Sequence, residues 1–253
     1  MLRWYGNNQT GLSFTVGNQP FGVAFDGANI WVTNFGSNTV SKLVVSTGVP
    51  AAGSPFAVGN QPAGVAFDGA NIWVANFADN TVSKLVASTG APAAGSPFAV
   101  GNGPSWVAFD GANIWVTNQG NGTVSKLVAS TGAPAAGSPF TVGAAPQGVA
   151  FDGANIWVAN QDSGTVSKLV ASTGAPAAGS PFAVGIQPVG VAFDGVNIWV
   201  ANRGSGTVSK LVASTGAPAA GSPFAVGFSP HGVAFDGASI WVANRDSATV
   251  SEL

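Results

Sequence analysis

Few side chains in this 253-residue chain are suited to catalysis. It contains no Cys, one His (His231) and one Glu (Glu252), and only 7% of its residues are charged. Because imidazole is the side chain that titrates near neutral pH, His231 is the one candidate general base, and a Ser nucleophile would have no other. Lone residues of these types do not make a catalytic set or a metal site. We therefore predict no enzyme activity, no metal and no cofactor.

The structural elements that must position these residues are encoded by a tandem sequence repeat. A Trp stands at one fixed interval of 42 residues, at Trp31, Trp73, Trp115, Trp157, Trp199 and Trp241. A period of this length indicates a repeat architecture. The units begin near residues 18, 60, 102, 144, 186 and 228, and we expect one domain over residues 1–253.

Each unit has the pattern of four short strands. In the second unit, residues 64–67 precede an Asp-Gly turn, residues 71–76 are β-branched and aromatic, and residues 81–86 and 96–101 supply two more strands. The third strand carries Ser83 and Lys84, so we place it farther out than the first two. No segment has the 3.6-residue apolar period of a helix. Four antiparallel strands in each of six units predict an all-β fold, a six-bladed β-propeller.

The two ends of the sequence predict how the ring closes. Residues 12–17 match a fourth strand without a blade of their own, and the last unit ends after its third strand at Leu253. We expect residues 1–17 to add the missing outer strand to the last blade as a clasp. Such pairing would close the ring and cover two sheet edges.

The repeated phrase also carries a family resemblance. Residues 30–34 and 114–118 read Ile-Trp-Val-Thr-Asn, and four other units read Ile-Trp-Val-Ala-Asn. These phrases resemble the YVTN-type repeat of the NHL and streptogramin (virginiamycin B) lyase-like propellers, over all six units. The resemblance implies a propeller, and for the lyases it implies a catalytic His with a carboxylate-bound magnesium ion at the channel mouth. Here His231 and Asp246 share the last unit, but no His-plus-Glu set can form there.

One end of the predicted ring is constant and the other varies. The Asp-Gly turns and Ser-Thr-Gly connectors recur almost unchanged, so the six framework Asp residues and the Asn that ends each phrase are interpreted as structural. The loops after the second strand and before the first strand differ from unit to unit. Loops on a rigid scaffold commonly carry binding function. Drift of surface loops, or the duplication history of the units, is the alternative explanation.

The variable end supplies the candidate ligand-binding residues. Trp106, which stands where every other unit has Gly, could stack on a sugar or an aromatic ring, or could plug the channel. Arg203 and Arg245 could clamp a carboxylate or a phosphate, or could be solvated or paired with Asp162 or Asp246. The full predicted set is Phe21, Phe35, Phe77, Trp106, Gln119, Gln147, Gln161, Arg203, His231 and Arg245.

Charge and composition limit the partners. A net charge of −2 without a basic stripe argues against nucleic acid, and no apolar run is long enough to span a membrane. The chain shows no signal peptide. Exported bacterial proteins often have charge-poor Thr/Ser/Asn/Gly-rich repeats, so a bacterial extracellular or periplasmic location is favoured while the compartment stays open. A closed ring is expected to be a monomer.

Three functional hypotheses follow. The first is a non-enzymatic binding or scaffold propeller, from a recently amplified or engineered repeat, which recognises a small molecule, glycan or protein at its variable end. The second is a streptogramin-lyase-like enzyme that uses His231. The third is a propeller with no selected ligand. Scattered changes such as Val45, Val49, Val196 and Ser239 favour natural amplification over a designed repeat.

Overall fold

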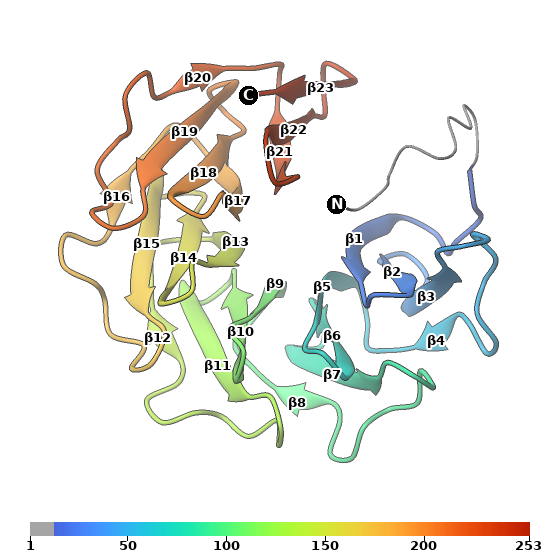
Figure 1. Cartoon of the computed structure of the whole chain (residues 1–253). Coiled ribbons are helices and arrows are strands. Elements are labelled where there is room, and N and C mark those ends of the chain that lie inside the picture. Colours follow the sequence, from blue (N-terminus) through green and yellow to red (C-terminus); the bar gives the residue numbers. More distant parts are fainter. Residues whose placement is uncertain (1–12) are drawn as a thin grey trace.

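A computed structural model describes residues 13–253 and confirms the predicted all-β fold. Its strands form six sheets that are arranged around a centre as the blades of a propeller (Figure 1). No helix, and therefore none able to cross a membrane, is found among these residues. In each blade, strand follows strand from the centre outward.

The strands have the following bounds. The first three blades comprise β1 (Pro20–Phe25), β2 (Asn29–Asn34), β3 (Thr39–Val44) and β4 (Phe56–Ala57); β5 (Pro62–Phe67), β6 (Asn71–Asn76), β7 (Thr81–Val86) and β8 (Phe98–Ala99); and β9 (Pro104–Phe109), β10 (Asn113–Asn118), β11 (Thr123–Val128) and β12 (Phe140–Thr141). The last three comprise β13 (Pro146–Phe151), β14 (Asn155–Asn160), β15 (Thr165–Val170) and β16 (Phe182–Ala183); β17 (Pro188–Phe193), β18 (Asn197–Asn202), β19 (Thr207–Val212) and β20 (Phe224–Ala225); and β21 (Pro230–Phe235), β22 (Ile240–Asn244) and β23 (Thr249–Glu252).

The framework Asp residues form turns, as predicted from their six identical copies. In the second blade, one Asp68 carboxylate oxygen accepts hydrogen bonds from the backbone N–H groups of Ala70 and Asn71, while the other accepts the indole N–H of Trp73 at 2.7 Å. Burial raises the pKa of Asp68, but these hydrogen bonds outweigh it and hold the pKa below 3.8. The turn thereby fixes the orientation of the Trp side chain that packs against the next blade.

The hydrophobic core lies between blades rather than within them. Trp31 and Val40 of the first blade pack with Ile72, Val74 and Leu85 of the second, and the same contacts recur at the next four interfaces. Each blade therefore presents two different apolar faces, one to each neighbour. The four inner blades bury both faces in this way, so their stability depends on their neighbours.

A buried lysine joins most pairs of neighbouring blades. Lys84 is 6% exposed, its ammonium donates to the carbonyl oxygen of Ala129 in the next blade at 2.7 Å, and it lies over the Trp73 ring. Lys42, Lys126 and Lys168 make the equivalent bond at the same distance. The third strand lies outside the first two, as predicted, and its Lys is buried between blades.

The sixth sheet differs from the other five. It contains three strands, β21-β22-β23, and residues 13–17 form no strand, so within residues 13–253 the expected clasp is not made. Residues 1–12 of the expected clasp lie outside the described residues. The ribbons of the first and last blades, as far as residues 13–253 describe them, stand apart in Figure 1. Val23 and Val250, which belong to the two facing blades, are 64% and 62% exposed.

Residues 14–17 instead lie against the first blade, as a fourth strand lies against the blade that follows it. The N–H of Gly17 donates to the Asn34 side chain at 3.0 Å, as Gly59 does to Asn76 at 3.1 Å. A Cβ atom at Gly48 would overlap the Phe14 ring. Residues 14–17 thus contact the first blade as a fourth strand would, but they do not pair with β23.

We predict that equivalent Val residues of the last two blades contribute very differently to stability. Val208 is fully buried between blades and Val250 is mostly exposed. Val208→Ala should lower the free energy of unfolding by about 2 kcal/mol, because it removes buried methyl groups and leaves a cavity. Val250→Ala should change it by less than about 0.5 kcal/mol. Chemical denaturation of both variants measures the difference, and equal losses would show that the ring is closed in solution.

Candidate functional site

The variable loops meet at one end of the propeller, around the start of the inner strands. In every blade the Pro that opens the first strand pairs with the Asn that ends the second, and a register shift follows before pairing resumes. In the first blade this irregularity covers Phe21 and Gly22, and in the last blade it covers His231 and Gly232. The irregular residues carry the side chains at the mouth of the channel.

A row of rings crosses this mouth. The ring of Phe35 lies 6.1 Å from that of Phe21, the Phe21 ring lies 6.2 Å from Trp106, and the Trp106 ring lies 6.3 Å from His231. These residues come from the first, third and last blades. Such separations between tilted rings are those of favourable aromatic contacts. The structure therefore brings together four of the ten predicted residues.

Trp106 occupies the mouth rather than standing at its edge. Its indole is half-buried and reaches both the first and the last blade. Elsewhere Gly fills this position where inner strands are crowded: a Cβ on Gly64 would come within 2.6 Å of the Ser105 carbonyl oxygen. The Trp106 backbone N–H is held by the hydroxyl of Thr117 at 3.0 Å. Trp106 thus fills the mouth and presents the rest of its ring at the variable end.

Two guanidinium groups act on the imidazole of His231. Burial lowers the pKa of His231 from its ordinary value of 6.5, and the positive charges of Arg203 and Arg245 lower it further. The imidazole is therefore neutral at pH 7 and can donate and accept a hydrogen bond. Arg203 and Arg245, from neighbouring blades, make this side of the mouth electropositive.

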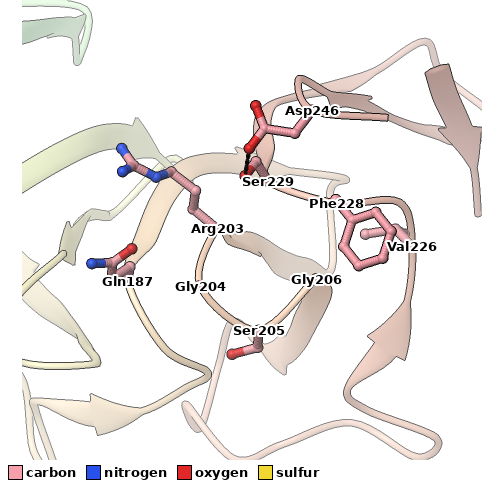
Figure 2. A pocket seen from close by; sticks show the side chains of 9 residues that line it. All are labelled: Gln187, Arg203, Gly204, Ser205, Gly206, Val226, Phe228, Ser229 and Asp246. Carbon is pink, nitrogen blue, oxygen red and sulfur yellow. Dashed lines mark hydrogen bonds between the residues drawn. The ribbon is translucent and has the colours of Figure 1, made fainter. Parts of the chain in front are cut away.

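A pocket of about 600 Å³ opens beside Arg203, between the fifth and last blades (Figure 2). Arg203 and Gln187 stand on one side of it, and Phe228 on the other. Asp246 accepts a hydrogen bond from the Ser229 hydroxyl, and Arg203 points away from it. Among the alternatives considered for Arg203, pairing with Asp246 is therefore not seen here.

The other predicted residues are not part of the row. Gln147 donates from its side-chain amide to that of Gln161 at 2.9 Å. The Phe77 ring lies against Gly103, at the entry to the third blade. Gln119 anchors its loop through its backbone N–H, which donates to the Gly103 carbonyl oxygen. These four residues belong to the variable end without converging on His231.

Phe228 was missed by reasoning from the sequence. It is 75% exposed and lines the pocket. The signal was present in the sequence, because the equivalent position reads Asn in the first three units, then Ala144, Ile186 and Phe228. Gln187 and Ser229, which also line the pocket, belong to the same variable segment before the inner strand.

The Asn residues that end each phrase brace the blade, as predicted. The Asn76 amide donates to the hydroxyls of Thr81 and Ser83 at 3.0 and 2.9 Å, while its oxygen accepts the backbone N–H of Gly59. Within residues 13–253, no group of three or more carboxylate or imidazole side chains is placed to hold a metal ion.

Comparison with known proteins gives the fold but no closer relationship. No protein-family profile and no curated protein matches the sequence. Among solved structures, the chain is similar to a catalytically inactive variant of virginiamycin B lyase from Staphylococcus aureus with quinupristin (17% identity, TM-score 0.77, covering 94% of this chain and 81% of that one). It is similar also to a streptogramin B lyase (16%, 0.66, 93% and 93%) and to a protein of unknown function from Desulfotomaculum acetoxidans (15%, 0.75, 90% and 79%). The resemblance inferred from the sequence is confirmed at the level of the fold.

We predict that removing one guanidinium raises the pKa of His231. Arg203→Gln deletes a positive charge that disfavours the imidazolium ion, so the pKa should move upward toward 6.5. Histidine NMR titration gives the pKa without ambiguity, since the chain has a single His. Phe77→Ala, which alters another part of the variable end, serves as the control. An unchanged pKa in Arg203→Gln would place the Arg203 charge away from the imidazole.

Proposed function

We propose that this chain is a non-enzymatic binding propeller that holds a small ligand with a flat apolar part at its variable end. The observation that carries the proposal is the row of rings formed by Phe35, Phe21, Trp106 and His231. A flat ligand can add to this row by stacking, and the two Arg residues can receive an anionic group.

The different roles of the constant and variable residues of the repeat support this proposal over neutral drift of the loop sequences. The turn-forming Asp68, the Asn76 brace and the Lys84 bond use the polar groups of the framework inside the blade or between blades. At the variable end, by contrast, Trp106 replaces the small residue that the crowded inner strands favour. A bulky side chain at a position that favours Gly is better explained by a role than by neutral change.

The proposal predicts that Trp106→Gly weakens binding without unfolding the protein. Gly is the residue at this position in the other five units, so the variant keeps the fold. Hits from a small-molecule screen by saturation-transfer NMR, with indole derivatives and methyl glycosides as probes, should bind the variant at least about tenfold more weakly. Phe77→Ala is the matched control, since its ring lies outside the row. Hits that bind Trp106→Gly as tightly as the original chain contradict this placement.

A lyase-type activity is the second candidate, supported by one observation. The lowered pKa leaves His231 neutral beside Trp106, the protonation state that a general base needs. We predict no conversion of quinupristin, the compound present in a structure of similar fold, because within residues 13–253 no group of three or more imidazole or carboxylate side chains is placed to hold a metal ion with His231. Chromatography of the incubated compound tests this. Conversion that His231→Ala abolishes would overturn the non-enzymatic proposal.

A further inference from the structure

The pocket between the fifth and last blades belongs to a repeated feature of the variable end. Similar depressions occur between the first and second blades, and between the fourth and fifth. Each is lined by the loop after the second strand of one blade and by the segment that enters the next blade. The depressions can therefore be compared with one another, position by position.

In the depression between the first two blades, the polar side chains bind each other. Asn60 donates from its amide to Asp79 at 2.8 Å and accepts from Asn38 at 3.0 Å. The Asn38 oxygen in turn accepts the backbone N–H of Gln61. This network ties the loops together and leaves few polar groups for a ligand.

Between the fifth and last blades the same network is replaced. Phe228 stands where Asn60 stands, and Gly206 where Asn38 stands. Both positions 38 and 206 have a positive φ, near 60°, which Asn tolerates and Gly adopts without strain. The substitutions remove the cross-loop hydrogen bonds and the Asn38 side chain, so the space between the loops is left open.

The open pocket offers three kinds of contact. The Arg203 guanidinium, on one side, makes no hydrogen bond to another residue of the described part of the chain. Asp246 uses one carboxylate oxygen for Ser229, which leaves the other as an acceptor. Phe228 lines the side of the pocket opposite Arg203, and most of its side chain is exposed.

We infer that this pocket binds an acidic sugar, with its carboxylate on Arg203, a hydroxyl on Asp246 and the apolar face of its ring on Phe228. A guanidinium binds a carboxylate through two parallel hydrogen bonds, and a carboxylate accepts from sugar hydroxyls. A volume of about 600 Å³ is within the range of small-ligand sites and holds one or two sugar rings. This inference builds on the proposed binding function and names the ligand class for the part of the variable end beside the mouth.

Three probes separate charge from ring recognition in the full chain. D-glucuronate carries both a carboxylate and a sugar ring. Its uncharged methyl ester carries the sugar ring alone, and acetate carries the carboxylate alone. We expect glucuronate to shift the backbone NMR signals of residues 203–206 and 228–229, and to bind at least about tenfold more tightly than either other probe. Equal affinity for acetate would reduce the pocket to an anion site and overturn the inference.

Variants locate the binding and separate it from the proposal for the mouth. Arg203→Gln and Phe228→Ala should each weaken glucuronate binding about tenfold, whereas Gln161→Ala, the position of Arg203 one blade earlier, should not. Trp106→Gly should leave glucuronate binding at the pocket unchanged. No shift at residues 203–206, or binding abolished by Trp106→Gly alone, would overturn the inference. If Trp106→Gly alone abolished glucuronate binding, the proposed binding function at the mouth would still stand. If the screening hits bound Trp106→Gly as tightly as the original chain, only the proposed function at the mouth would be rejected.

Discussion

The structure depends on one repeated contact, the packing of a Trp side chain against the next blade. Its orientation is set inside its own blade, where Asp68 accepts the indole N–H of Trp73. Its ring is then covered by Ile, Val and Leu side chains of the following blade, and the ammonium group of Lys84 lies over it. Because the core lies between blades, no blade can be moved without exposing apolar surface on its neighbours. This makes the ring a rigid support for its loops.

The same contact is not made at one place among residues 13–253, on the outer face of the last blade. Trp241 has no following blade within the described residues, and it is 38% exposed whereas Trp73 is fully buried. Glu252 stands at the position that Lys84 occupies in its own blade, so it cannot donate to a carbonyl oxygen across the remaining opening. An interface between the last and first blades would therefore lack the lysine bond and would differ chemically from the other interfaces.

Crowding of the inner strands limits which positions can carry function. Gly64 lies so near the third blade that a side chain would collide with its backbone. Trp106 is the exception, and its bulk is directed into the mouth where Phe21 and His231 meet it. The outer parts of the variable loops are less constrained, which allows Phe228 and Gly206 to replace an internal hydrogen-bond network with an open pocket.

Some features could be predicted from the sequence because they depend on neighbours along the chain. The 42-residue period, the Asp-Gly turns and the alternation of strands determine the blade, and a comparison of the six units locates the variable end. Local reasoning failed where the partner is remote. Lys84 is buried because its acceptor, Ala129, lies one blade away. Within residues 13–253 no fourth strand pairs with β23, and this depends on how the two ends of the ring are placed.

The sequence by itself thus determined the fold and which of its loops vary from unit to unit. Only the tertiary structure decided which of them meet. More than 80 residues, or two units of the repeat, separate Phe21 from Trp106 and Trp106 from His231. The Trp106 ring nevertheless lies close to both of the other rings. The physical reason is that the curvature of the ring, fixed by packing between blades, brings distant loops to one mouth. Phe77 and Gln119, by contrast, both contact Gly103 at the entry to the third blade.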